Sequence, residues 1–128
     1  MATTRETITA PEAPEAVGPY SHAVRTGDLL FCSGQVALNQ SGELVGDTAA
    51  EQAEQCLRNL QAVCDAAGTT LDRAVRCTVY FTDIAGDFAD VNEVYGHFFE
   101  RHPPARVGIG VAALPKGAQV EIDAIIAL

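Results

Sequence analysis

Hydrophobic residues change their spacing along this chain from a helical period to a strand period, and that change most restricts the possible folds. Between residues 49 and 67 apolar side chains recur every three or four positions, and from Arg73 to Thr82 they recur every second position. The first spacing is typical of a helix with one buried face, and the second of a half-buried strand. A chain with both patterns buries its apolar faces by packing helices on a sheet.

The helix predicted first along the chain has signals at both ends. Thr48 and Glu51 fit the capping-box pattern, in which each side chain accepts a hydrogen bond from the other residue's backbone amide. Gly68 stands where a left-handed residue usually ends a helix. The predicted buried stripe consists of Ala49, Ala53, Cys56, Leu57, Leu60, Val63, Cys64 and Ala67.

Other elements are predicted on both sides of this helix. The apolar run Leu29–Cys32, followed by a turn at residues 33–35, predicts a strand. A second helix is expected from about Asp87, with that aspartate as its N-cap, and residues 102–104 (His-Pro-Pro) end it. Residues 1–16 are expected to form a partly irregular arm, in which a short strand near residues 7–9 is possible.

The C-terminal part predicts a hairpin. Residues 106–111 and 120–124 alternate in polarity on either side of a turn at residues 114–117. Matching their apolar faces places the remaining side chains together on the other face: Arg106, Gly108, Gly110, Glu121 and Asp123. The whole order predicts an α+β fold, with residues 1–128 as a single domain built from one mostly antiparallel sheet covered by two helices.

Composition and charge narrow the possible partners. The chain has 128 residues, of which 48% are hydrophobic, and this suits one globular domain. Its formal charge of −9 disfavours binding to nucleic acid or to anionic membranes. No apolar run approaches the roughly 20 residues that span a membrane, and no secretory leader is recognisable, so we expect a cytoplasmic protein without membrane partners.

Cysteines and acidic residues give no sign of a metal site. The chain has four cysteines and no C-x-x-C pair, so buried reduced thiols are expected rather than disulfides or zinc ligands. Asp83, Asp87, Asp90 and His97 are near one another in sequence. Helix capping and first-turn charge explain the aspartates better than metal binding does.

The polar face of the predicted hairpin suggests a binding site. Arg106 and Glu121 would flank the open space left by Gly108 and Gly110. An arginine fork beside such a space suits a small carboxylate ligand. The alternative is a solvated polar face that tolerates two glycines. The functional interpretation requires both charged side chains to reach one ligand-sized gap, and their placement on opposite surfaces would contradict it.

Six short motifs extend this interpretation because they occur in one order with one set of spacings. They are GPYS (18–21), CSGQ (32–35), VNEVY (91–95), PAR (104–106), LPKG (114–117) and VEI (120–122). Together they resemble the RidA (YjgF) family of enamine/imine deaminases, from about Pro14 to the C-terminus. Each motif alone is weak evidence, whereas six in register over most of the chain are specific.

The resemblance implies a fold, an assembly and a reaction. The implied subunit is a chorismate-mutase-like α+β domain that forms a homotrimer, with its sheets inside and ligand clefts between neighbouring subunits. The family hydrolyses 2-imino acids or their enamine tautomers to 2-keto acids and ammonia, without a metal or other cofactor. The implied substrate is therefore a small carboxylate.

Individual positions carry the family's roles. Arg106 matches the carboxylate-binding arginine, and Glu121 matches the glutamate that positions or activates water. The positions that match the remainder of the cleft are Tyr20, Ser33, Gly34, Asn92 and the backbone of Gly108. A turn with a packed ring would also explain Tyr20, and an ordinary polar helix position would explain Asn92. Ser33 is interpreted as a hydrogen-bond donor to the ligand, not as an activated nucleophile.

Two departures leave the substrate open. Many members have cysteine where this chain has Gly108, and many have glutamine where it has His22. One alternative function is a non-catalytic module that binds small carboxylates, and another is a pathway-specific deaminase for a bulkier enamine. Ribonuclease activity, described for some relatives, ranks third because the chain is acidic and lacks a basic stripe.

Overall fold

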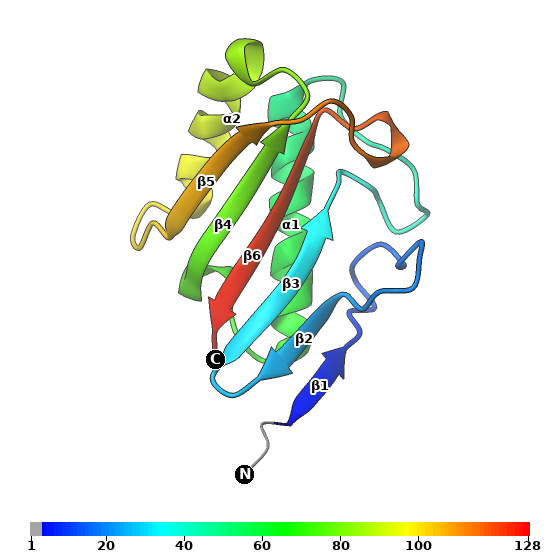
Figure 1. Cartoon of the computed structure of the whole chain (residues 1–128), viewed down its shortest axis with the longest axis vertical. Coiled ribbons are helices and arrows are strands. Elements are labelled where there is room, and N and C mark those ends of the chain that lie inside the picture. Colours follow the sequence, from blue (N-terminus) through cyan, green and yellow to red (C-terminus); the bar gives the residue numbers. More distant parts are fainter. Residues whose placement is uncertain (1–3) are drawn as a thin grey trace.

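A computed structural model describes residues 4–128 and shows one twisted sheet with both helices on the same face (Figure 1). The strand order is β1-β2-β3-β6-β4-β5, and every neighbouring pair is antiparallel except β4 and β5. The strands are β1 (Arg5–Ile8), β2 (Ala23–Thr26), β3 (Leu29–Gln35), β4 (Ala74–Phe81), β5 (Ala105–Gly110) and β6 (Val120–Ala127). The helices are α1 (Ala49–Ala67) and α2 (Ile84–Phe98), with short 3₁₀ turns at Leu71–Arg73 and Pro115–Gly117. The predicted α+β fold is confirmed.

Helix α1 forms as its sequence predicts. The Thr48 hydroxyl accepts from the Glu51 amide at 3.1 Å, and a Glu51 carboxylate oxygen accepts from the Thr48 amide at 3.1 Å. Gly68 ends the helix with a φ of 80°. The buried face of α1 meets the centre of the sheet, and the largest fully buried apolar side chains there are Leu30, Leu57, Leu60, Ile122 and Ile126.

The N-terminal arm contains a short strand, as the sequence allowed near residues 7–9, and the strand begins two residues earlier. Residues 5–8 form edge strand β1, while residues 1–3 lie outside the part of the chain that the structure describes. Strand β2 was not predicted, although it pairs with β3 across a two-residue turn in which Gly27 has a φ of 57°. Four residues carry too short a pattern for alternation to separate a strand from a loop.

The N-terminus of α2 also differs from the prediction. The helix begins at Ile84, and its N-cap is Asp83, whose side chain accepts from the Gly86 amide at 3.2 Å. Asp87 lies in the first turn instead. Both aspartates suit a helix start, and only the path of the preceding strand decides which one caps it.

The predicted hairpin of the last two strands is wrong. Strand β4 lies between β5 and β6, and β5 runs parallel to β4 after the α2 crossover. Alternation assigns residues to faces but does not identify the neighbouring strand. The face assignment is correct for β6, where Val120, Ile122 and Ala124 are buried.

The face assignment is inverted for β5. Val107 and Ile109 are exposed, whereas Gly108 and Gly110 lie against α2. An added Cβ would lie 3.6 Å from Phe88 at Gly108 and 3.2 Å from Ile84 at Gly110. The glycines therefore admit the helix, which explains why the apolar strand residues lie on the other face.

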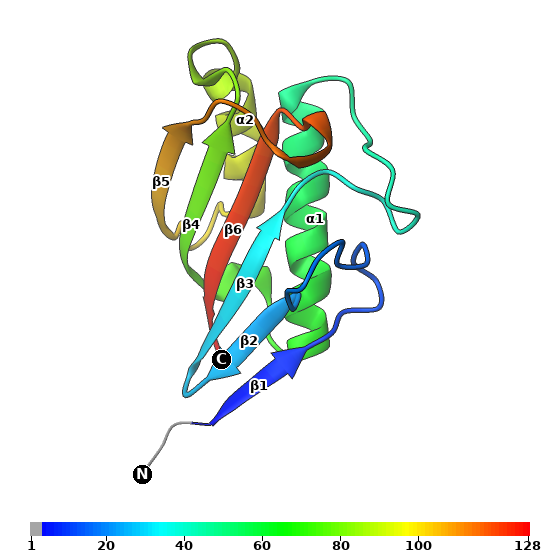
Figure 2. The same ribbon diagram turned by 45° about the vertical axis from the view of Figure 1, so that its right-hand side comes forward.

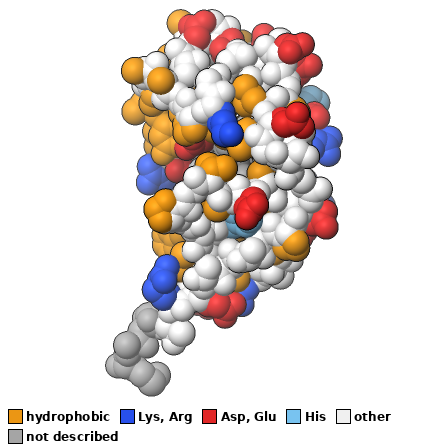
Figure 3. All heavy atoms as spheres, turned by 90° about the vertical axis from the view of Figure 1, so that its right-hand side faces the viewer, with side chains coloured by type: hydrophobic (Ala, Val, Ile, Leu, Met, Phe, Trp, Pro, Cys, Tyr) orange, Lys and Arg blue, Asp and Glu red, His pale blue; other side chains and the backbone are white. Residues whose placement is uncertain are grey.

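The face of the sheet away from the helices is open. Figures 1 and 2 show both helices behind this face, and in Figure 3 hydrophobic side chains gather along the left-hand margin, where the open face is seen edge-on. Phe31 and Ile109 are among the exposed hydrophobic residues, at 43% and 45% of their full accessibility. No helix among residues 4–128 is long and apolar enough to cross a membrane.

Candidate functional site

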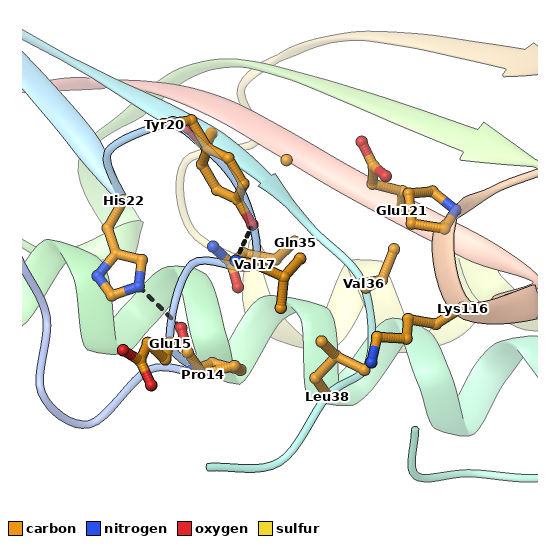
Figure 4. A pocket seen from close by; sticks show the side chains of 13 residues that line it. Pro14, Glu15, Val17, Tyr20, His22, Gln35, Val36, Leu38, Lys116 and Glu121 are labelled. Atoms are coloured by element: carbon orange, nitrogen blue, oxygen red, sulfur yellow. Dashed lines mark hydrogen bonds between the residues drawn. The ribbon is translucent and has the colours of Figure 1, made fainter. Parts of the chain in front are cut away.

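A cavity of about 340 Å³ lies at the C-terminal end of β3 (Figure 4). Its walls come from the loop before β2, the end of β3 and the segment that follows it, the 3₁₀ turn before β6, and β6 itself. Four of the seven predicted site residues line it, namely Tyr20, Ser33, Gly34 and Glu121.

Glu121 is the partly buried carboxylate of this cavity, and Gly34 makes room for it. A Cβ at residue 34 would overlap the Glu121 carboxylate, so a side chain there would displace the acid. Partial burial raises the pKa of Glu121, and the negative charge of Asp123 raises it further. A carboxyl group with a raised pKa is better matched to proton transfer near neutral pH than an ordinary glutamate.

The two hydroxyl groups of the cavity are already partly engaged. The Ser33 hydroxyl donates to the Ser21 carbonyl at 2.6 Å, and the Tyr20 hydroxyl accepts from the Val17 amide at 3.4 Å. The Ser33 proton is therefore committed, and this side chain can offer a ligand an acceptor but not the donor that we expected. Tyr20 keeps its proton free for a ligand.

His22 anchors the wall of the cavity. Its Nδ1 accepts from the Ala10 amide at 2.8 Å, and its Nε2 lies 2.8 Å from the Pro14 carbonyl. Only the neutral tautomer with its proton on Nε2 makes both hydrogen bonds. This buried histidine therefore holds residues 10–14, rather than offering a free ring at the rim.

The remaining predicted residues form a second cluster on α2 and β5. Arg106 donates through Nη1 to Asn92 Oδ1 at 2.7 Å. Its guanidinium carbon lies 5.5 Å from the ring centre of Phe88 and 4.8 Å from that of Tyr95. Gly108 lies beside them in a narrow crevice of about 10 Å³. These contacts hold the arginine in one orientation and leave its Nη2 and Nε donors for a carboxylate.

Within one chain the two clusters do not meet. Arg106 is paired with Cys77, which faces the helices, whereas Glu121 is paired with Tyr80, which faces the open side. Paired residues of neighbouring strands share a face, so the arginine and the glutamate lie on opposite faces of the sheet. The prediction that a hairpin of one chain brings both into one gap is therefore wrong, and a single chain does not meet the condition on which the functional interpretation of this polar face rested.

Sequence reasoning gave no site role to several residues of these clusters, among them Phe88, Tyr95, Lys116, and Asp123 as a charge neighbour of Glu121. Asp123 accepts from the Tyr80 hydroxyl at 3.0 Å and from the Thr78 amide at 3.1 Å. Positions 88, 92 and 95 share one helix face, so a polar Asn92 in that apolar stripe was an available signal. Lys116 belongs to the LPKG motif, but the sequence assigned it no role; it lines the cavity from the left-handed region at a φ of 63°.

The fold and the two clusters define a small α+β protein with a carboxylate-lined cavity and a separate, pre-oriented arginine. Residues 10–128 match the model of the family described as endoribonuclease L-PSP. The chain therefore belongs to this family, which includes the RidA (YjgF) proteins.

Sequence alignments with several relatives extend over nearly the whole chain. A RutC family protein, y4sK of Sinorhizobium fredii, is 56% identical over 124 residues, which are 96% of this chain and 98% of the relative. The human 2-iminobutanoate/2-iminopropanoate deaminase is 43% identical over 122 residues, or 94% of this chain and 88% of the relative. The crystal structure of E. coli TdcF with bound serine superimposes with a TM-score of 0.89 at 39% identity, covering 96% of this chain and 98% of that one.

Proposed function

We propose that this protein hydrolyses 2-imino acids, or their enamine tautomers, to 2-keto acids and ammonia. The observation that carries the proposal is a half-buried carboxyl group, Glu121, with a raised pKa at the wall of a ligand-sized cavity. Relatives named as 2-iminobutanoate/2-iminopropanoate deaminases at 43–44% identity support the reaction class.

The chemistry needs a proton acceptor beside an electrophilic carbon. The water oxygen adds to C2 of the protonated imine, and Glu121 takes a proton from that water as the C=N electrons move to nitrogen. Glu121 then returns the proton to the carbinolamine nitrogen. The C–N bond breaks with its electrons on nitrogen and releases ammonia, and the hydroxyl proton passes to that ammonia, which leaves the keto acid and ammonium. General-base help of this kind contributes about 10²–10⁴ in rate.

We further propose that each site combines two subunits of a homotrimer. Arg106 of one subunit would bind the substrate carboxylate, while Glu121 of its neighbour handles the proton. The separation of the two side chains within one chain supports this arrangement, because a monomer cannot present both to one small substrate. The stacked and hydrogen-bonded guanidinium is already oriented, which reduces the cost of ordering it on binding.

Subunit mixing tests the shared site. Arg106→Ala and Glu121→Gln trimers should each be inactive towards 2-iminobutanoate that a threonine dehydratase generates from threonine. After co-refolding at a 1:1 ratio, about one quarter of the sites would combine an intact Arg106 with an intact Glu121, so activity should recover to that level. The control mixes Arg106→Ala with the double variant, which cannot build an intact site.

The outcomes separate the alternatives. If mixed trimers, verified by two affinity tags, stay inactive, the proposal of a shared site is wrong. Wild-type protein that binds 2-ketobutyrate but does not accelerate keto-acid formation would instead be a carboxylate-binding module. Wild-type activity in either single variant would remove that residue from the mechanism.

A further inference from the structure

One loop, residues 10–20, supplies part of the lining of the cavity at the end of β3. The lining residues that it contributes, all labelled in Figure 4, are Pro14, Glu15, Val17 and Tyr20. The buried side chains of this loop are small ones, those of Ala10, Ala13 and Pro14. They bury little apolar area, so the position of the loop depends strongly on its hydrogen bonds.

His22 makes both of the buried hydrogen bonds that join this loop to the remainder of the described chain. Its ring contacts the Ala10 amide and the Pro14 carbonyl, each at 2.8 Å. One further hydrogen bond leaves the loop, from the Gln40 side chain to the Pro11 carbonyl at 3.2 Å, and it is exposed to water. The His22 ring itself is only 6% exposed. This one side chain therefore provides most of the polar anchoring of the loop.

Both hydrogen bonds require a neutral ring. Nδ1 accepts from the Ala10 amide, and Nε2 donates to the Pro14 carbonyl. A second ring proton would turn Nδ1 into a donor that faces another donor, so the Ala10 amide would stay buried without an acceptor. The cost of such a group corresponds to a change of about 5- to 150-fold in the equilibrium between the observed position of the loop and a displaced one.

No neighbouring charged group replaces the lost hydrogen bond. The acidic and basic side chains on the elements around the ring are Glu12 and Glu15 of the loop, Arg5 and Glu6 of β1, Arg25 of β2, Lys116 of the 3₁₀ turn and Glu121 of β6. The other titratable groups there are the Tyr20 hydroxyl and the thiols of Cys32 on β3 and of Cys56 and Cys64 on α1. Within residues 4–128 none of these groups forms a hydrogen bond or an ion pair with the ring.

We propose that His22 is a positioning residue: its neutral ring holds the 10–20 loop against the cavity, and protonation of the ring allows this wall to move away. The Val17 amide donates to the Tyr20 hydroxyl at 3.4 Å, so displacement of the loop also removes a contact that orients this hydroxyl. The consequence for turnover rests on the proposed deaminase function, whereas the release of the loop does not.

Hydrogen exchange of the Ala10 amide tests the release of the loop. NMR at about pH 8 and about pH 5.5, a range in which histidine side chains change charge, gives its protection factor after correction for intrinsic exchange. In the wild-type protein we expect this factor to fall at least about fivefold at the lower pH. The amide of Leu60, in the middle of α1, should keep its protection, because the change is local. A constant protection factor at Ala10 would overturn the proposal.

An amide side chain separates the charge of the ring from its hydrogen bonds. Glutamine has one acceptor group and one donor group and does not titrate, so His22→Gln should keep the Ala10 amide protected at both pH values. His97→Gln, at an exposed histidine on α2, should keep the wild-type response. An equal loss of protection in His22→Gln would assign the response to another group. If His22→Gln does not fold, the ring nitrogen shifts of wild-type His22 decide, since a loss of protection that does not follow protonation of this ring contradicts the proposal.

Turnover tests the consequence for the site. We compare kcat/KM for 2-iminobutanoate in the wild type and in His22→Gln, with the dehydratase in excess at both pH values. The ratio of wild type to variant should fall at least about fivefold from the higher to the lower pH, whatever its value at the higher one. Glu121 is present in both proteins, so its own titration cancels in the ratio.

The two measurements separate the failure of each proposal. A ratio that stays constant while the Ala10 protection factor falls would show that the loop moves without affecting the site, and His22 would then have no positioning role. If neither protein hydrolyses the imine, the deaminase proposal is wrong, and the exchange of the Ala10 amide alone decides whether the His22 ring holds the loop.

Discussion

Glu121 and Asp123 are successive outward-facing residues on β6, and their proximity determines how the first one titrates. Burial and the charge of Asp123 both favour the protonated form of Glu121, so its pKa is raised. The base form is the active form in the proposed mechanism. Activity should therefore fall as the pH drops through the raised pKa, at a higher pH than an ordinary glutamate would give.

Substitution of Asp123 separates the effect of its charge on the pKa of Glu121 from the effect of burial. In Asp123→Asn the nearby negative charge is lost, so the acidic limb of the kcat/KM profile should move to lower pH. Glu121→Gln should remove the limb and lower kcat by about 10²–10⁴. Both profiles are measured with the coupled threonine dehydratase assay at dehydratase excess. If the acidic limb stays at the same pH in Asp123→Asn, the limb reports the titration of a group other than Glu121.

Asn92 acts on Arg106 in the structure, although the sequence suggested a contact with the ligand. Asn92→Ala removes the acceptor of the 2.7 Å hydrogen bond and frees the guanidinium to rotate. A hydrogen bond to a charged group contributes about 1.5–3 kcal/mol, so we expect KM to rise roughly tenfold or more with a smaller change in kcat. Glu93→Ala, on the neighbouring exposed position of α2, is the control. An unchanged KM would show that the aromatic rings alone position the arginine.

For the helices and strands, the sequence correctly predicts those features that depend on local periodicity. Helix α1 has its cap and terminator where Thr48 and Gly68 indicate, and the alternation over residues 73–82 corresponds to β4. The neighbour of each strand is decided by long-range contacts, and the α2 crossover places β4 between β5 and β6. Six of the seven candidate site residues lie in the motifs, and Gly108 follows the arginine by two positions; only the strand order shows that they form two clusters.

The glycines of β5 misled the face assignment and offer a test of its packing against α2. At Gly108 an added Cβ makes ordinary contacts, so Gly108→Ala should raise the free energy of unfolding by about 0.5 kcal/mol by restricting the unfolded chain. At Gly110 the Cβ would lie 3.2 Å from Ile84, so Gly110→Ala should lower that free energy by about 1 kcal/mol through overpacking. Urea unfolding at one fixed protein concentration measures both. Equal effects of the two substitutions would contradict the closer approach of α2 to β5 at Gly110 than at Gly108.

At the scale of the whole molecule, the sheet has one face covered by helices and one face without cover. Charge disfavours nonspecific self-association, because the chain carries a formal charge of −9. The open face nevertheless exposes large apolar groups on three strands, including Phe31 on β3 and Val107 and Ile109 on β5. Apolar area of this kind on an otherwise acidic surface marks an interaction site. In the proposed trimer it would pack against copies of itself.

A charged residue on this face should therefore dissociate the trimer, and the shared site should be lost with it. Ile109 is 45% exposed in the single chain, so Ile109→Asp should cost the folded monomer little, whereas burying an unpaired carboxylate at an interface is expensive. We expect light scattering to give a monomer mass and imine hydrolysis to fall by at least about 10²-fold, since a lone chain cannot bring Arg106 to Glu121. Ala66→Asp, on the solvent side of α1, should remain trimeric and active. A trimer that tolerates Ile109→Asp would move the interface away from the open face, and an active monomer would show that one chain can build the site alone.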